Sequence, residues 1–343
     1  MACLITGGTG FIGSRIVRDL VREGQPVIIF DSFPQMNAVK QFLSESELGG
    51  VKFLQGDILD LASLFRVCKE YEVENIIHMA YFKILHAKAN PLWATRVNCE
   101  GTGNVFEAAR ILRLKRVVWA SSIAVFGPPE MYRGESIPTD APHYPDTFYG
   151  ACKSFNEHQA AYYCDTYSLD IIGLRYAVGY GPNKVGSTSY PIIHELIEKP
   201  AVGEPGKVPY GESVINWLHV DDAAAAAVYA LRAPRTKTRV FTIAGETHSV
   251  KEVAEYVRNS SRRLRSHSRK GVWSSRVILI CSQLVRNLGT TIDCPSKTES
   301  ARQLMPSDAS VGYRLSKDRH INSCGERVYR DRRSSRRRSG HPD

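Results

Sequence analysis

The first 175 residues alternate between short apolar runs and longer segments in which apolar positions recur with helical spacing. The apolar runs are rich in Val and Ile, as in strands of a sheet that is covered on both faces. We predict strands over 2–6, 26–30, 51–54, 75–80, 117–121 and 169–175. We predict helices between them, over 14–22, 61–70, 91–112 and 151–167.

Strands that alternate with helices indicate right-handed βαβ units. The predicted fold class is therefore α/β, a Rossmann-type doubly wound parallel sheet with a smaller C-terminal substrate-binding region. After residue 175 the pattern is less regular, because Gly and Pro are frequent over 179–211, and we expect an irregular segment over the sheet edge. A helix over 221–231, a strand over 239–244 and a helix opening over 249–258 follow.

The charge of the chain is concentrated at its end. The net charge is +10, but residues 259–343 carry 19 Lys and Arg against 7 Asp and Glu, which leaves −2 for the rest. This segment is rich in Arg and Ser, and only 277–280 has a strand-like pattern. Three interpretations stay open: a disordered basic extension that binds nucleic acid, ordinary structure, or an out-of-frame gene end, which we favour. Because the body is near neutral, a nucleic-acid partner is not expected.

The cysteine pattern and the hydropathy exclude several classes of protein. The eight cysteines are scattered without a C-x-x-C pair, so we expect neither a metal site nor a disulfide framework. No apolar run approaches the length of a membrane span, and the chain opens on a strand-like segment without the basic region of a signal peptide. We expect a cytoplasmic protein with a small-molecule substrate and no membrane partner.

A glycine-rich turn between the first strand and the first helix predicts a dinucleotide site. Gly7, Gly10 and Gly13 lie in the sequence TGGTGFIG. Glycine is required in such a turn because side chains would block the approach of a pyrophosphate to the backbone. The helix that follows offers free N–H groups and a favourable dipole to this anion.

Two aspartates at strand ends extend the predicted nucleotide site. Asp31 ends the second strand, where a carboxylate accepts hydrogen bonds from both ribose hydroxyls and repels a 2′-phosphate. No basic residue lies in 32–36, so NAD is favoured over NADP. Asp57 follows the third strand; it is placed to reach the adenine amino group, and a role as a turn or helix cap is nearly as well supported.

A tyrosine, a lysine and a serine form the predicted catalytic set. Tyr149 and Lys153 lie four residues apart, which on a helix puts them on one face. A nearby cation lowers the pKa of a phenol, so we expect Lys153 to prepare Tyr149 as a general base. Ser122 follows the fifth strand, and in open parallel sheets ligands bind beyond the carboxyl ends of the strands.

The order of these motifs resembles a known family. TGGTGFIG, Asp31, GDILD, IIHMA, SSIAVFG, YGACK, LRYAVGYGP and WLHVDDAA are similar, in order and spacing, to the motifs of the extended short-chain dehydrogenase/reductases, the NAD-dependent epimerase/dehydratase family. The resemblance covers roughly 2–258 and implies the set Ser122–Tyr149–Lys153. It implies that Lys153 also holds the nicotinamide ribose and that Asn98 supports a water linked to this lysine.

The resemblance also implies further contacts, domain limits and an assembly. His78, Met79, Ala80, Tyr176 and Val178 would line the cofactor. Phe11 and Ile12 of the glycine loop, and Ile58 after Asp57, are assigned to the same site. The implied division is an NAD-binding domain over 1–176, to which 221–245 returns, a substrate-binding region over 177–220 and 246–262, and the tail over 263–343. A homodimer through the helices near 91–112 and 151–167 is implied as well.

Departures from the family pattern narrow the expected reaction. The dehydratases of this family have T-D-E at the positions of Ser122, Ile123 and Ala124, so dehydration is disfavoured. Decarboxylation is disfavoured as well, because the decarboxylases have a glutamate at the position of Ala124. In nucleotide-sugar epimerases the motif R-Y-F-N corresponds to 175–178 of this chain, and R-D-F-I-H corresponds to 215–219. Here Val178 stands in place of the Asn and Ile215 in place of the Arg that hold the diphosphate.

Several functions stay open after these departures. We favour a dehydrogenase acting on a sugar-like or small hydroxylated substrate, with a UDP-sugar 4-epimerase as the alternative. In that alternative, Lys184 or Lys207 would have to hold the diphosphate in place of the missing arginine. A non-catalytic NAD sensor is the contrasting class, and the complete catalytic set argues against it. His219 and the two aspartates after it are expected to cap a helix rather than perform chemistry.

Overall fold

The computed structural model describes residues 2–267 except 34, 134–136, 185–186 and 209–210, with side chains described to 260. The strand-like pattern over 277–280 and nearly all of the Arg- and Ser-rich segment therefore lie outside the described residues. The predictions made for that segment remain predictions.

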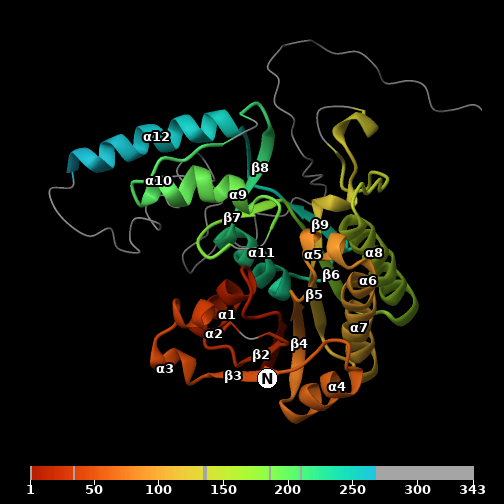
Figure 1. The fold of residues 1–343 in the computed structure, drawn as a ribbon. Coiled ribbons are helices and arrows are strands. Elements are labelled where there is room, and N and C mark those ends of the chain that lie inside the picture. Colours follow the sequence, from red (N-terminus) through yellow and green to blue (C-terminus); the bar gives the residue numbers. More distant parts are fainter. Residues whose placement is uncertain (1, 34, 134–136, 185–186, 209–210, 268–343) are drawn as a thin grey trace, which may run out of the picture.

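A seven-stranded sheet forms the centre of the protein (Figure 1). Its strand order is β3-β2-β1-β4-β5-β6-β9, and every pairing is parallel. This is the doubly wound order, and it confirms the predicted fold class. The strands are β1 (Ala2–Thr6), β2 (Val27–Asp31), β3 (Val51–Gln55), β4 (Val73–His78), β5 (Arg116–Ser122), β6 (Ile171–Tyr176) and β9 (Val240–Ile243).

Helices cover both faces of this sheet, and side chains alternate between two cores. On β1, Cys3 and Ile5 pack with α1 (Gly13–Arg22) and α11 (Val220–Arg232), whereas Leu4 packs on the other face. That second core includes residues of α4 (Leu61–Glu70), α7 (Gly101–Leu112) and α8 (Phe148–Tyr167). The fully apolar strands predicted from the sequence are thus explained by burial on both sides.

The predicted helix over 91–112 is present but contains an irregular turn. It consists of α6 (Pro91–Thr95), the π-helix η1 (Arg96–Glu100) and α7. A π-turn inserts an extra residue and is frequently found near functional sites. Short helices that the sequence pattern did not predict are α2 (Met36–Lys40), α3 (Glu45–Leu48), α5 (Ile84–Ala89), η2 (Ile123–Val125) and η3 (Pro129–Met131).

A second, three-stranded sheet lies beside the first, in the order β10-β8-β7. Its strands are β7 (Val178–Tyr180), β8 (Val214–His219) and β10 (Glu246–Ser249). Its core is shared with α9 (Tyr190–Ile193), η4 (His194–Glu198), α10 (Lys199–Ala201) and α12 (Val250–His267). The expected irregular segment over 179–211 is therefore wrong in part, because 190–201 is one uninterrupted helical stretch.

A buried arginine ties the two parts of the protein together. Arg15 of α1 is almost fully buried; its Nη1 donates to Phe11 O at 3.1 Å and its Nη2 donates to Pro182 O at 2.6 Å. Its guanidinium lies over the Phe42 ring, 4.3 Å from the centroid. The helix that follows the glycine loop is thereby fastened to the segment after β7.

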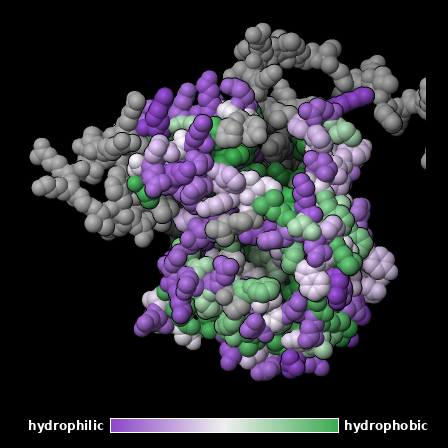
Figure 2. Space-filling view, viewed as in Figure 1, coloured by the Kyte–Doolittle hydropathy of each residue, from purple (hydrophilic) through white to green (hydrophobic). Residues whose placement is uncertain are grey.

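The outer face in Figure 2 is mostly polar, and apolar residues gather along a hollow between the upper and lower parts. The division of the chain into a domain over 1–176 and a substrate region stays a prediction. No described helix is long and apolar enough to cross a membrane.

Candidate active site

The glycine loop fits a dinucleotide because its glycines allow close packing that other residues would prevent. Gly7 has a φ of 67°, and a Cβ there would lie 2.7 Å from Ala80 N. A Cβ on Gly13 would lie 2.2 Å from Gly7 O. A Cβ on Gly10 would meet only Gly7 O, at 3.1 Å, so this position is otherwise open. The loop is thus shaped for the approach of a ligand to its backbone.

The start of α1 is ready to receive an anion. The N-cap residue is Ile12, which makes no side-chain capping hydrogen bond, and the first turn holds no acidic residue. The N–H groups of Ser14 and Arg15 are hydrogen-bonded to Gly10 O and Ile12 O, each at 3.0 Å, but the dipole of the helix favours negative charge at this end. The dipole and the lack of acidic residues in this turn both suit a pyrophosphate.

Asp31 lies at the carboxyl end of β2 beside this loop. Its Oδ2 accepts hydrogen bonds from Thr9 Oγ1 at 2.6 Å and Thr9 N at 3.2 Å, and its Oδ1 accepts one from Phe33 N at 3.2 Å. These bonds fix the carboxylate while it still lines a large cleft. Asp57 lines the same cleft and also accepts a hydrogen bond from Leu59 N at 3.0 Å, so both roles weighed for it from the sequence are compatible.

The cleft runs along the carboxyl ends of β1, β2 and β4 and has a volume of about 1470 Å³. Ligand sites typically measure about 300–1,000 Å³, so it has room for a dinucleotide. Most of the residues predicted for the cofactor line it. They are Gly7, Gly10, Phe11, Ile12, Gly13, Asp31, Asp57, Ile58, Met79 and Ala80.

Tyr149 and Lys153 lie on the first turns of α8. Thr147 caps this helix by accepting a hydrogen bond from Gly150 N at 3.0 Å. Both functional side chains are buried, and Lys153 Nζ lies 5.6 Å from the centroid of the Tyr149 ring. The same ammonium donates a hydrogen bond to Ala120 O of β5 at 2.5 Å.

Ser122 ends β5 and meets Tyr149 across a close contact between that strand and α8. Its Oγ accepts a hydrogen bond from Ala124 N at 3.1 Å, and the Ser122 side chain is near enough to Tyr149 to oppose the rise in the pKa of that phenol. A Cβ on Gly150 would lie 2.1 Å from Ala124 O, so only glycine lets the helix come this near. Ser122, Tyr149 and Lys153 are therefore brought together at the carboxyl end of β5.

The expected pKa of Tyr149 is wrong in direction. Burial raises the pKa of this phenol well above its ordinary value, and Tyr81 adds to the rise, while the Ser122 side chain opposes it. Burial also lowers the pKa of Lys153 to about 7. Removing water disfavours the charged form of each group, and Lys153 directs its ammonium to Ala120 O instead of the phenol.

Other predicted residues have mixed placements. Tyr176 is buried, and its hydroxyl has no hydrogen-bond partner among the described residues, so a cofactor group would satisfy it. Val178 lies in β7 and does not line the cleft. The Asn98 side chain is occupied by Phe82: its Oδ1 accepts from Phe82 N at 2.7 Å and its Nδ2 donates to Phe82 O at 3.1 Å.

Histidines behave as structural groups. His78 does not line the cleft as expected, because its ring is held between Thr6 Oγ1 at 2.6 Å and Thr102 Oγ1 at 3.1 Å. His219 caps α11 by accepting a hydrogen bond from Asp221 N at 3.3 Å, which confirms the predicted cap. No cluster of metal-ligating side chains occurs in the part of the chain that the structure describes.

Sequence analysis missed Tyr81. It lines the cleft, lies 5.8 Å from the Tyr149 ring between centroids, and has Lys153 Nζ 4.7 Å from its own centroid. It follows the end of β4, so the strand-end rule that selected Ser122 would also have selected Tyr81.

Three positions bear on diphosphate binding, namely Ile215, Lys184 and Lys207, and they lie away from the predicted catalytic set. Ile215 packs in the core of the second sheet. Lys184 is buried beside β7, where its Nζ donates to Ser189 Oγ at 2.8 Å and also to Gly179 O. Lys207 is exposed, and its backbone N donates to Glu195 at 2.7 Å. The two lysines considered as replacements for the missing arginine therefore lie in different places.

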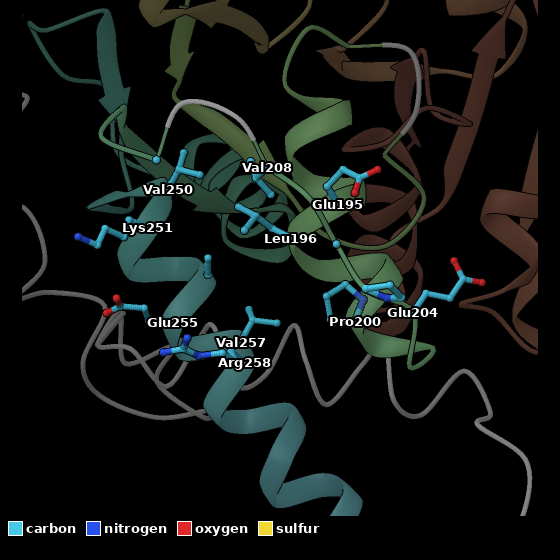
Figure 3. Close-up of a pocket in the computed structure, with 14 residues that line it drawn as sticks. Glu195, Leu196, Pro200, Glu204, Val208, Val250, Lys251, Glu255, Val257 and Arg258 are labelled. Carbon is cyan, nitrogen blue, oxygen red and sulfur yellow. The ribbon is translucent and has the colours of Figure 1, made fainter.

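A second cavity of about 810 Å³ lies between η4, α10 and α12, and Figure 3 shows Leu196, Val208 and Val257 directed into it. All the residues that line this cavity belong to the predicted substrate-binding region over 177–220 and 246–262, but none of the individually predicted cofactor or catalytic residues is among them. It is separate from the catalytic set.

Comparison with known proteins agrees with the geometry. Residues 3–244 match the NAD dependent epimerase/dehydratase family. The chain belongs to this family. The family resemblance stated from the motifs is thereby confirmed, and with it the use of NAD.

Individual relatives are named for two activities. UDP-glucose 4-epimerase of Corynebacterium glutamicum is 28% identical over 275 residues, which are 75% of this chain and 80% of the relative. The solved UDP-glucose 4-epimerase of Thermus thermophilus in complex with NAD is 27% identical, with a TM-score of 0.64 over 76% of this chain and 84% of that one. An L-threonine dehydrogenase from Cupriavidus necator shares the fold, with a TM-score of 0.67 and 24% identity over 76% of this chain and 84% of that one.

Proposed function

We propose that this family member catalyses NAD-dependent hydride transfer at a secondary alcohol carbon of a sugar-like or small hydroxylated substrate. The observation that carries the proposal is the convergence of Ser122, Tyr149 and Lys153 at the carboxyl end of β5. Tyr149 and Lys153 pack there against Tyr81, which lines the dinucleotide cleft. Bound NAD supplies the hydride acceptor. The protein supplies the groups that bind the alcohol and move its proton.

Each of the three side chains has a role that follows from its position. Ser122 hydrogen-bonds the substrate oxygen, and Tyr149 in its phenolate form accepts the proton that this oxygen releases, becoming a neutral phenol. Because burial raises the pKa of Tyr149, the phenolate needs a cation beside it, and Lys153 is the nearest ammonium to that ring. Gly7, Gly10, Gly13 and Asp31 line the cleft and hold the dinucleotide.

The outcome of the reaction separates two candidates. A dehydrogenase is favoured because Ile215 replaces the diphosphate-binding arginine and is packed in a hydrophobic core. Loss of a charged contact with a diphosphate would cost about 1.5–3 kcal/mol. A UDP-sugar 4-epimerase is favoured by the similarity to UDP-glucose 4-epimerases over three quarters of the chain.

The experiment that tests this proposal incubates the purified protein with NAD and, in turn, UDP-glucose, UDP-galactose, L-threonine and free sugars. Growth of NADH absorbance indicates a dehydrogenase, whereas inverted product without NADH indicates an epimerase. Tyr149→Phe should remove turnover and keep NAD binding. Unchanged turnover in this variant, or no turnover of any compound by the wild type, would contradict the proposal.

We also propose a homodimer through α6, α7 and α8. Support comes from large apolar side chains exposed on these helices, with Leu92 74% exposed, Tyr162 59% and Phe155 53%. Sedimentation of the wild type and of a Leu92→Glu, Phe155→Glu variant tests the idea. A monomeric wild type would disprove it. The described cysteines, Cys3, Cys68, Cys99, Cys152 and Cys164, are free thiols, which supports a cytoplasmic location.

A further inference from the structure

A buried carboxylate connects the elements that carry the catalytic set. Glu157 of α8 has a side chain only 5% exposed. Its Oε1 accepts hydrogen bonds from Ser121 Oγ of β5 at 2.5 Å and from Arg175 Nε of β6 at 2.8 Å. Its Oε2 accepts one from Arg175 Nη2 at 2.6 Å. One charged group therefore joins a helix and two strands where all three meet the active site.

Ser121 makes this connection relevant to catalysis. It directly precedes Ser122, and successive side chains of a strand point to opposite faces. When Ser121 is held by Glu157 on one face, the backbone that presents Ser122 on the other face is fixed as well. Glu157 also lies one turn after Lys153 on the same face of α8, so the same carboxylate sets the position of this helix against β5.

Arg175 extends the connection to the segment that leads into α8. Its Nη1 donates to Thr139 O at 2.6 Å and its Nη2 donates to His143 Nε2 at 2.9 Å. His143 Nδ1 in turn lies 2.8 Å from Ser154 Oγ of α8. Because Arg175 only donates, His143 accepts through Nε2 and carries its hydrogen on Nδ1. The segment over 139–143 is thus held between β6 and α8.

We propose that Glu157 is a positioning residue of the active site, which through Ser121 and Arg175 sets the relative placement of Ser122 and Tyr149. The inference rests on the proposed function for its catalytic consequence. Glu157 hydrogen-bonds Ser121 and Arg175, and no direct hydrogen bond joins it to Ser122 or Tyr149 among the described residues, so it acts through the residues that it holds.

The alternative is that Glu157 only stabilises the fold, and the protein contains a matched control for it. Asp170 and Arg116 form a second largely buried ion pair at the opposite ends of the same two strands, with Arg116 Nη2 2.6 Å from Asp170 Oδ2. Removing either carboxylate leaves a buried arginine without its counter-charge, which is destabilising in both places. Only Glu157 adjoins catalytic groups.

The experiment compares Glu157→Gln with Asp170→Asn by thermal unfolding, NAD affinity and turnover of the substrate found in the panel. We expect both variants to unfold at lower temperature. Glu157→Gln should lower kcat 10- to 100-fold while the Kd for NAD stays within twofold, and Asp170→Asn should leave kcat within twofold. A kcat for Glu157→Gln within twofold of the wild type, or an equal loss in Asp170→Asn, would overturn the proposal.

A milder pair of variants covers the case in which Glu157→Gln does not fold. Ser121→Ala removes one hydrogen bond without leaving a charge unpaired, and Ser121→Thr restores the hydroxyl with a side chain that strands accept. We expect a several-fold lower kcat for Ser121→Ala and recovery in Ser121→Thr. Equal kcat for Ser121→Ala and the wild type would overturn the proposal.

Amide hydrogen exchange tests the positioning without any turnover. Glu157→Gln should speed exchange over 139–149 and 121–124, whereas Asp170→Asn should speed it only near residues 168–172 and 230–233. A wild type that turns over no substrate would disprove the proposed function, and the exchange pattern would still decide the role of Glu157. Unchanged exchange over 139–149 in a folded Glu157→Gln variant would disprove that role.

Discussion

The two ends of the seven-stranded sheet use the same chemistry for different purposes. At the amino ends, Arg116 is paired with Asp170 and also donates to Ala230 O at 2.8 Å, near the end of α11. At the carboxyl ends, Arg175 is paired with Glu157 next to the catalytic set. Parallel strands place all loops that follow them at one edge, so groups at that edge act on ligands. We expect the opposite edge to contribute to stability alone.

The largest difference between the two edges is expected for their buried cations. Lys153→Met should lower turnover by a factor of about 10³ or more, since general acid–base catalysis contributes about 10²–10⁴-fold. Arg116→Met should leave turnover nearly unchanged. Steady-state kinetics of the two variants with the panel substrate measures the contrast, and similar losses in both would remove the distinction between the edges.

The same two cations should differ in how stability depends on pH. Burial lowers the pKa of Lys153 to about 7, whereas an unfolded lysine titrates near 10.5, so the unfolded chain binds more protons between these values. The wild type therefore gains stability as pH rises from 7 to 10.5. Lys153→Met should be more stable than the wild type at pH 7, with the gain shrinking toward pH 10. Arg116→Met should be less stable at both, as chemical denaturation would show.

Substitution of a glycine should affect NAD binding at the carboxyl edge of the sheet and only stability at the amino edge. Gly13→Ala places a Cβ 2.2 Å from Gly7 O, so we expect at least about a 100-fold loss of NAD affinity. Gly24 is at the amino edge, has a φ of 75°, and has open space around its Cβ position. Gly24→Ala should cost about 1–2 kcal/mol of stability and leave NAD affinity unchanged. Calorimetric titration with NAD measures the affinity of both variants, and chemical denaturation measures the stability of Gly24→Ala.

The smallest effect is expected for the choice between dinucleotides. Asp31→Asn keeps an acceptor for Thr9 but removes the charge that repels a 2′-phosphate. NAD affinity should fall about tenfold, equivalent to about 1.4 kcal/mol, and the ratio of NADP to NAD affinity should rise. Asp57→Asn is the control at the next strand end and should not change this ratio. A parallel change in both variants would mean that Asp31 does not discriminate the cofactors.

The sequence was most informative where chemistry dictates residue identity. Gly7 and Gly13 were predictable because the tight backbone packing at both positions leaves no room for a side chain. The role of Asp31 at a ribose stays a prediction. The Glu157 network was not, since Ser121, Arg175 and His143 are distant in sequence and no motif relates them. Such a network depends on which strands become neighbours.

Two errors have identifiable physical causes. The helical stretch over 190–201 contains Pro191 in its first turn, where proline is accepted, and Pro200 at its end. Both prolines were interpreted as breakers. The pKa of Tyr149 was predicted from its neighbour Lys153 alone. Burial dominates it, and burial is not visible in the spacing of two residues.

The contact of Arg15 with Pro182 has a consequence for protein engineering. A split version of the protein, cut after Tyr176, would leave in its first fragment a guanidinium that loses its partner on the second. The two fragments should therefore recombine when produced together, and a reporter built on this cut would respond to reassembly. Because β9 returns from the second fragment to pair with β6, such a cut would also divide the seven-stranded sheet, so the link between β6 and β7 is a poor place to shorten the chain.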